Sequence, residues 1–187
     1  MVSIKARRAI PPLDRKRLDE LALRYVGRYA TTRSRLRSYL ARKIRERGWG
    51  EPVAADLEAL GQRFAELGYI DDAAFALNKS QALTARGYGK RRVLDKLRLA
   101  GVGEDDGLAA REHADGQALE AALRFARRRR IGPFAAAAPD LKQRQKVIAA
   151  MIRAGHGFAL ARAIADLAPG AAVDRDALGE RARFTAI

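Results

Sequence analysis

The sequence predicts an all-α protein made of three tandem three-helix modules in an elongated, curved arrangement. Apolar residues recur at steps of three and four along most of the chain, which is the spacing of a buried helix face. No long stretch alternates apolar and polar residues as a half-buried strand would. Three segments also share one pattern, in which a basic residue is followed by apolar residues at a four-residue step and then by glycine: 35–48, 92–101 and 146–155.

The recurrence of this pattern gives the module arrangement. Leu36, Val93 and Val147 hold the same place in the three copies, at intervals of about 55 residues, and another helix precedes each copy. Chance similarity among amphipathic helices is the alternative. Because a module of this size buries little apolar surface alone, neighbouring modules should pack end to end. We expect a flexible basic arm over residues 1–13, helical modules over 14–50, 51–103 and 104–168, and a loose tail over 169–187.

The first helices follow from caps and apolar spacing. Asp14 is expected to cap a helix whose apolar and aromatic face comprises Leu18, Leu21, Ala22, Tyr25 and Tyr29. Thr31-Thr32 mark the turn into a second helix with Leu36, Leu40 and Ile44 on one side, and Gly48 ends it. Trp49 is interpreted as a core plug in preference to a base-stacking residue. The next helix has an interior seam at Val53, Leu57, Leu60, Phe64 and Leu67.

The clearest helix signals lie between Leu67 and Val102. Asp71 is a good N-cap, and Ile70 and Phe75 fall at the positions of a hydrophobic staple, so a helix is predicted from Asp71 to about Arg86. Gly87-Tyr88-Gly89 breaks it. A second helix then runs over 90–100, with Val93, Leu94, Leu97 and Ala100 as its core face, and Gly101 ends it. Phe75 and Leu97 are expected in the core.

The last third of the chain is predicted as four shorter helices. The acidic stretch 103–116 holds a short helix around residues 108–113, and residues 118–130 form a better one that ends in four arginines. Asp140 caps the next helix, which Gly155 ends, and a last helix reaches Pro169. Residues from about 168 onward show no long periodic face.

These residues resemble the RecX family, regulatory proteins of the bacterial recombinase RecA. The resemblance lies in the order Leu67-Gly68-Tyr69-Ile70-Asp71-Asp72, a following Phe-Ala, the Gly87-Tyr88-Gly89 turn with its basic run, and a hydrophobic helix ending in Ala-Gly-Val. It covers about residues 18–167 and is strongest in the central module. It implies three tandem three-helix repeats, in agreement with the pattern above.

Charge and composition restrict the partner and the compartment. The net charge is +15, and its Lys and Arg gather into runs on particular helices, so a polyanion or an acidic protein surface is expected in preference to a merely soluble basic face. The chain has no cysteine, which fits a reduced cytosol, and cytoplasmic localisation is expected. It shows neither a signal-peptide core nor a membrane-spanning stretch, so no membrane partner is expected.

No pattern of catalytic residues is found, and we expect a protein that is not an enzyme, with no metal, cofactor or small-molecule substrate. His113 and His156 lack neighbouring ligands at metal spacing and are interpreted as incidental. For the Asp71-Asp72 pair, helix capping, which explains at least Asp71, is favoured over a metal site or an acid-base pair. The glycine-rich turn before Lys90 lacks the spacing and the Ser or Thr of a phosphate-binding loop.

The candidate binding residues are the cations of three basic faces. The turn and helix of the central module come first, followed by a face of the second helix and by the arginine run: Arg86, Lys90, Arg91, Arg92 and Lys96; Arg33, Arg35, Arg42 and Arg45; Arg127, Arg128, Arg129 and Arg130. Arginine pairs with phosphate or carboxylate through its forked donors, so these faces suit a nucleic-acid backbone or an acidic protein groove. Tyr88 either stacks on a base or packs.

The resemblance implies regulation of RecA in homologous recombination, DNA repair and the SOS response. A RecX-like protein lies in the groove of the RecA filament on single-stranded DNA and inhibits filament growth, strand exchange, ATP hydrolysis and coprotease activity. Single- or double-stranded DNA is a further candidate partner. The alternative is a stand-alone basic helical protein that binds DNA or RNA without RecA.

Overall fold

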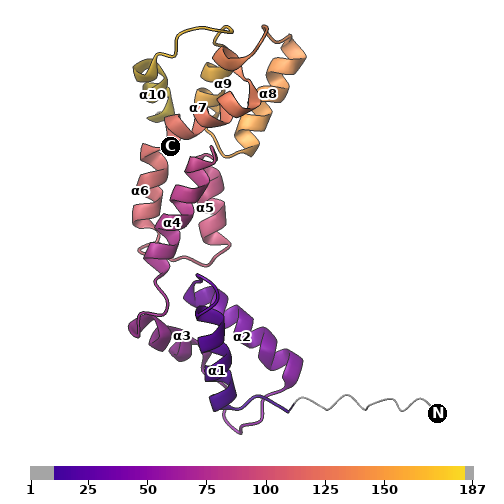
Figure 1. The fold of residues 1–187 in the computed structure, drawn as a ribbon, viewed down its shortest axis with the longest axis vertical. Coiled ribbons are helices and arrows are strands. Elements are labelled where there is room, and N and C mark those ends of the chain that lie inside the picture. The colour runs from indigo at the N-terminus through magenta and orange to yellow at the C-terminus, as the bar shows by residue number, and fades with distance from the viewer. Residues whose placement is uncertain (1–10, 184–187) are drawn as a thin grey trace, which may run out of the picture. The chain divides into compact units, whose positions relative to one another are not determined.

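The computed structural model describes residues 11–183 as a succession of helices (Figure 1). They are α1 (Arg15–Val26), α2 (Arg33–Arg47), α3 (Leu57–Glu66), α4 (Asp72–Ala85), α5 (Lys90–Arg98), α6 (Leu108–Gly116), α7 (Ala118–Arg129), the 3-10 helix η1 (Gly132–Phe134), α8 (Leu141–Arg153), α9 (Phe158–Ala165) and α10 (Arg175–Arg183). Over this range the β interaction is one isolated bridge between Leu13 and Trp49, so the all-α prediction is confirmed. The elongated, curved arrangement stays a prediction, and most of the expected basic arm lies outside the described residues.

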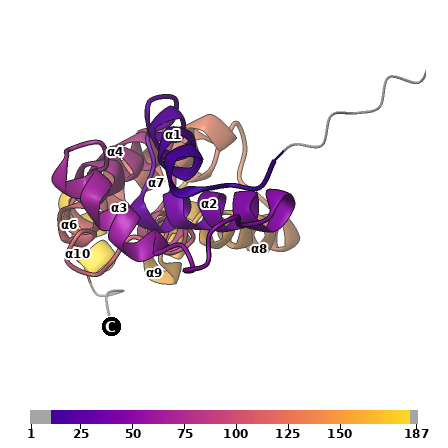
Figure 2. The ribbon, with the colours of Figure 1, turned by 90° about the horizontal axis from the view of Figure 1, so that it is seen from below.

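The described chain divides into two compact units, one ending at Asp72 and the other beginning at Ala73. The first unit holds α1, α2 and α3 around one hydrophobic core, and α1 and α2 lie side by side in both views (Figure 1 and Figure 2). Its buried side chains are Leu13, Leu18, Ala22, Leu36, Leu40, Leu60, Phe64 and Ile70. Trp49 is half-buried against this core, as expected of a plug, and its indole Nε1 donates to the Val53 carbonyl at 2.8 Å.

Side-chain caps begin several helices where the sequence predicts them. The Asp14 carboxylate accepts from the Arg17 amide at 2.8 Å, and the Thr32 hydroxyl accepts from the Arg35 amide at 3.1 Å. Asp140 and Gln143 form a capping box, in which each side chain accepts from the other residue's amide. These bonds satisfy amides that the first turn of a helix leaves free.

The second unit contains two hydrophobic clusters. One joins α4, α5 and α6 through small and aliphatic residues: Ala76, Leu83, Val93, Leu97, Ala110 and Ala114. The other joins α7, α8, α9 and α10 and includes Phe125, Met151 and Ile164. Tyr88 is half-buried and packs against both clusters, so of its two expected roles the structure gives it packing.

Two glycines let the start of α5 dock on the turn between α8 and α9. The Gly89 amide donates to the Ala154 carbonyl at 3.0 Å, and the Arg91 amide donates to the Gly155 carbonyl at 3.2 Å. A Cβ atom on Gly89 would lie 2.3 Å from the Gly155 carbonyl oxygen, so the backbones approach more closely than any side chain permits. This contact fixes the basic first turn of α5 within the second unit.

Several elements differ from expectation. Helix α3 begins only after the Asp56 cap, whose carboxylate accepts from the Ala59 amide, so Val53 precedes the helix and is 69% exposed. Leu67 follows the helix and is exposed as well, which leaves a shorter interior seam of Leu60 and Phe64. Phe75 is half-buried and lies outside the buried cores, whereas Leu97 is buried as expected.

The hydrophobic clusters group the helices differently from the expected modules. Helix α3 packs with α1 and α2, and α6 packs with α4 and α5, so the expected boundaries at residues 50 and 103 each separate a helix from its core. The segment expected to be a loose tail contains α10, whose Leu178 is buried against the α7–α9 core. Besides Leu178, an ion pair of Arg175 with Glu120 and an Asp174 carboxylate that accepts from the Asp176 and Ala177 amides hold this short helix.

Candidate partner-binding surface

The central basic cluster lies where α4 turns into α5. Arg86, Arg91 and Arg92 are exposed, while Lys90 and Lys96 are half-buried. The opposite side of α5 is apolar and buried, so packing directs the arginines outward. The Arg92 guanidinium lies 5.9 Å from the centre of the Tyr88 ring, and Lys90 forms a 2.7 Å ion pair with Asp115 of α6.

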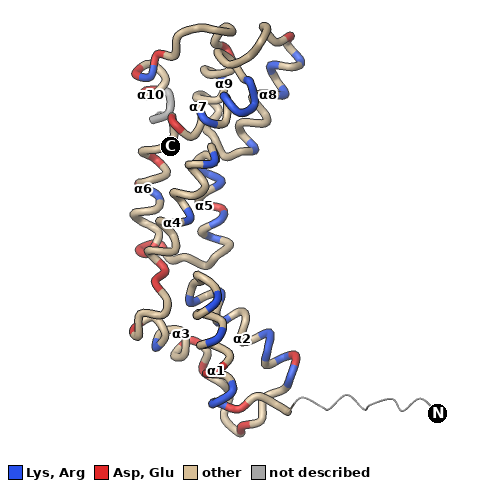
Figure 3. Tube along the Cα trace, in the orientation of Figure 1, with Lys and Arg blue, Asp and Glu red and all other residues tan. Residues whose placement is uncertain are grey.

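The structure brings the arginine run at the end of α7 against this same turn. Arg128 Nη1 donates to the Arg86 carbonyl oxygen at 2.6 Å, although the two residues are 42 positions apart. Arg128 and Arg129 also lie over the Phe125 ring, at 5.6 and 5.9 Å from its centre. Figure 3 shows the basic positions at the start of α5 and at the end of α7. We call these residues, Arg86, Arg91, Arg92 and Arg127–Arg130, the α5–α7 basic surface.

Aromatic rings and backbone geometry hold the arginine run in place. The Arg127 guanidinium lies 5.0 Å from the centre of the Phe134 ring in η1. Arg130 ends α7 in the left-handed conformation, with φ 53°. Cation–π contacts hold a guanidinium over a ring while its outward donors stay available to a ligand.

A buried histidine contacts the backbone of the α4–α5 turn. His156 is 2% exposed, and its Nε2 donates to the Gly87 carbonyl oxygen at 3.1 Å. Burial lowers the pKa of His156 to about 4, against the opposing effect of that hydrogen bond, so the ring is neutral at physiological pH. Its edge-on contact with Phe125, at 5.5 Å between centres, completes the support. The interpretation of His156 as incidental is therefore corrected.

The other histidine and the aspartate pair also have structural partners. His113 Nδ1 lies 3.1 Å from the Ser80 hydroxyl. The buried Asp72 carboxylate accepts from both the backbone amide and Nε of Arg33, at 3.0 and 3.1 Å. This arrangement ties the start of α2 to the last residue of the first unit. Among residues 11–183 no group of three or more His, Cys, Asp and Glu side chains is placed to hold a metal ion.

The predicted cations of α2 therefore differ in their surroundings. Arg33 is committed to Asp72 and also donates to Gln62 at 3.2 Å. Arg35 is half-buried in the first turn, whereas Arg42 and Arg45 are exposed farther along the helix. Arg42 lies 3.6 Å from Glu46 and 5.6 Å from the centre of the Tyr39 ring. The structure places these residues in the first unit, on a different body from the α5–α7 basic surface.

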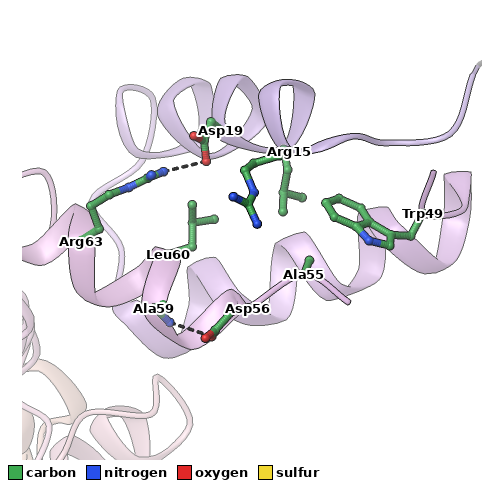
Figure 4. Close-up of a pocket in the computed structure, with 9 residues that line it drawn as sticks. Arg15, Asp19, Trp49, Ala55, Asp56, Ala59, Leu60 and Arg63 are labelled. Atoms are coloured by element: carbon green, nitrogen blue, oxygen red, sulfur yellow. Dashed lines mark hydrogen bonds and ion pairs between the residues drawn. The ribbon is translucent and has the colours of Figure 1, made fainter. Parts of the chain in front are cut away.

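A pocket of about 270 Å³ lies between α1 and α3 (Figure 4). Three of its ionic groups already have partners, because Arg63 pairs with Asp19 at 2.7 Å and Asp56 caps α3. Leu18, Leu60 and Trp49 form the apolar part of the lining. The pocket presents no paired acid and base, and we assign it no chemistry. Of the helices described, none is long and apolar enough to cross a membrane.

Comparisons with known proteins agree on one family. No protein-family model matches the chain. The regulatory protein RecX of Myxococcus xanthus is 33% identical over 165 residues, which are 81% of this chain and 86% of that protein. The regulatory protein RecX of Agrobacterium fabrum is 32% identical over 131 residues, 68% of this chain and 70% of that protein.

Solved structures show the same fold. The crystal structure of RecX from Lactobacillus salivarius matches with a TM-score of 0.56 and 14% identity, covering 80% of this chain and 92% of that one. A second RecX crystal structure matches with a TM-score of 0.53 and 22% identity, covering 76% of this chain and 67% of that one. Sequence identity above 30% across most of two relatives, together with this shared helical fold, shows that the chain belongs to the RecX family of regulatory proteins.

Proposed function

We propose that the protein regulates its cognate RecA, in the cytoplasm, as an inhibitor that binds in the groove of the RecA filament on single-stranded DNA. Bound there, it limits filament growth and with it strand exchange, ATP hydrolysis and coprotease activity. It acts by binding and not as an enzyme. Family membership supports the link to RecA, and the α5–α7 basic surface supports the mode of contact.

The observation that carries this proposal is the meeting of two arginine groups from separate helices. Arg86 lies in the α4–α5 turn and Arg128 lies in α7, yet Arg128 Nη1 donates to the Arg86 carbonyl oxygen, and both side chains are exposed. Guanidinium groups pair with carboxylates in two-point geometry, so a surface of this kind fits the acidic lining of a protein groove or a phosphate backbone within it. The basic residues of the first unit supply a further contact, and linked contacts raise the effective concentration of each other.

Binding to assembled filaments is the direct test. RecA is incubated with single-stranded DNA with and without ATP, and co-sedimentation of the protein with the filament is measured. We expect stronger retention where the filament has assembled than on bare single-stranded DNA, together with inhibition of DNA-dependent ATP hydrolysis. Equal retention on bare DNA and on filaments, with no inhibition, would favour the alternative of a stand-alone nucleic-acid-binding protein, whose affinity should fall steeply with salt.

A further inference from the structure

The end of α1 and the middle of α2 form an open depression of about 490 Å³ on the first unit. Three tyrosines line it, Tyr25 and Tyr29 at the end of α1 and Tyr39 on α2. This depression is separate from the pocket of Figure 4, and the sequence patterns assign its tyrosines only to a helix face. Its lining combines aromatic rings with positive charge and includes no acidic residue.

The tyrosines are arranged as a fixed base with one exposed ring. Tyr25 and Tyr39 are half-buried against the core and stack on each other, with centres 4.2 Å apart and an angle of 13° between planes. The Tyr29 ring lies 5.4 Å from that of Tyr25 at an angle of 53°. Tyr29 itself is 53% exposed, so the stacked pair positions a ring that a planar ligand can reach.

Four cations complete the lining: Arg24, Arg28, Arg42 and Lys43. Two of them, Arg42 and Lys43, lie over the Tyr39 ring at 5.6 and 5.9 Å from its centre. No acidic side chain is part of the lining. Glu46 lies just outside it and pairs with Lys43 at 2.6 Å and with Arg42 at 3.6 Å, which leaves the depression with an excess of positive charge.

A neighbouring depression shows that this combination is not general to the unit. Tyr69 is also 53% exposed and lies beside another ring, Phe64, at 5.6 Å. Its depression, however, is lined by four acidic residues, Asp14, Asp19, Glu20 and Glu51, as well as by cations. Phosphate groups would be repelled there and attracted beside Tyr29.

We propose that the depression around Tyr29 is a binding site for single-stranded nucleic acid, in which one base stacks on Tyr29 and the adjacent phosphates pair with Arg24, Arg28 and Arg42. A base in a duplex is already stacked on both faces, so only an unpaired strand offers a free face to the tyrosine. Stacking on a tyrosine accepts any base, because every base has a flat face. The inference rests on the proposed function for its setting, because the filament carries a single strand.

The test measures binding of the full chain to fluorescein-labelled (dT)12 by fluorescence anisotropy in the absence of RecA. Tyr29→Leu keeps an apolar side chain but removes the ring, and it should weaken binding by about tenfold, since stacking on an aromatic side chain typically contributes that order of affinity. Tyr29→Phe keeps the aromatic ring and should bind (dT)12 like the parent. Tyr69→Leu is the matched control, with the same substitution at the same exposure, and should bind like the parent.

Two further probes separate stacking from phosphate attraction. A twelve-nucleotide abasic strand has the phosphates but no bases, and its affinity should be the same for the parent and for Tyr29→Leu. Arg28→Ala should lower the dependence of log Kd on log salt by about 0.7, the value of one phosphate contact in a single strand, whereas Lys16→Ala on the exposed side of α1 should leave it unchanged.

The position of the base is tested by photocrosslinking. A (dT)12 strand carrying one 5-iododeoxyuridine should crosslink to Tyr29, as located by mass spectrometry of the digested protein. Equal binding of (dT)12 by Tyr29→Leu and the parent, equal losses in Tyr29→Leu and Tyr69→Leu, or a crosslink confined to other residues would overturn the inference. Because these measurements omit RecA, they fail or succeed independently of inhibition of RecA ATP hydrolysis, which tests the proposed function.

Discussion

Gly89 and Gly155 meet backbone to backbone, and this contact joins the two hydrophobic clusters of the second unit. Gly89 begins α5 and Gly155 ends α8, so the first turn of the basic helix rests on the α8–α9 turn. The conformation of Gly89, with φ −81° and ψ 170°, is one that any residue adopts. What requires glycine at this position is therefore space and not backbone freedom.

Gly89→Ala should destabilise the protein by roughly 1–3 kcal/mol, since its methyl group would need to displace the Gly155 carbonyl. Urea unfolding followed by circular dichroism measures the change. Gly116→Ala is the control, because Gly116 ends α6 with nothing near its missing Cβ and helical alanine is favoured over glycine. If both variants unfolded at the same urea concentration as the parent, the close contact between Gly89 and Gly155 would be refuted.

His156 should make the stability of the protein depend on pH between about 6.5 and 4. Burial depresses its folded-state pKa to about 4, so between these values the unfolded chain binds a proton that the folded chain excludes. The stabilisation is present above pH 6.5 and is lost as pH falls, by at most roughly 3 kcal/mol. Denaturant unfolding at a series of pH values measures it.

His156→Gln provides the comparison for this pH effect, because its amide can still donate to the Gly87 carbonyl but does not titrate. Carboxylates titrate in the same range in both proteins, so the informative quantity is the difference in unfolding free energy between parent and variant. That difference should shrink as pH falls from 6.5 to 4. A constant difference would show that His156 titrates normally in the folded protein.

Leu97→Ala should cost roughly 2–5 kcal/mol, because Leu97 is 4% exposed within the α4–α6 cluster and its truncation leaves a cavity. Phe75→Ala should cost less, since Phe75 is only half-buried and is not one of the buried side chains of that cluster. Thermal unfolding of both variants ranks the two sites. A larger loss of stability for Phe75→Ala than for Leu97→Ala would show that Phe75 is a core residue, as its spacing in the sequence predicts.

The sequence predicts most helices because their signals are local. Asp14 and Asp140 cap helices within one turn, and Gly101 supplies a left-handed residue shortly after α5, with φ 68°. Helix α10 escapes prediction because its main tertiary contacts are distant in sequence: Leu178 packs on the α7–α9 core and Arg175 pairs with Glu120, 55 positions away. Phe75 has the spacing of a core residue, but the structure leaves its side chain only half-buried.

The candidate surface is predicted in its residues but not in its assembly. Runs of arginine are visible in the sequence, yet only the fold shows that Arg128 reaches the Arg86 carbonyl while Arg33 is committed to the buried Asp72. The support from His156 depends on a contact across 69 positions, which no local pattern encodes. The tyrosine depression does have a local pattern in the sequence, because Arg24-Tyr25 and Arg28-Tyr29 are the same pair of residues repeated one helical turn apart.

Removing two arginines from the α5–α7 basic surface tests its role in binding. Arg91→Ala with Arg92→Ala removes two exposed charges from the first turn of α5, where the positive end of the helix adds to their attraction for an anionic partner. The melting temperature should stay close to that of the parent, as is usual for surface substitutions. Half-inhibition of RecA ATP hydrolysis on single-stranded DNA should require at least about fivefold more protein, equivalent to roughly 1 kcal/mol.

Lys142→Ala with Lys146→Ala is the matched control, because it removes the same charge from exposed positions of α8 in the same unit. Equal weakening by the two pairs at matched salt would make net charge the cause, and unchanged inhibition by the arginine pair would move the RecA contact to the exposed residues of α2.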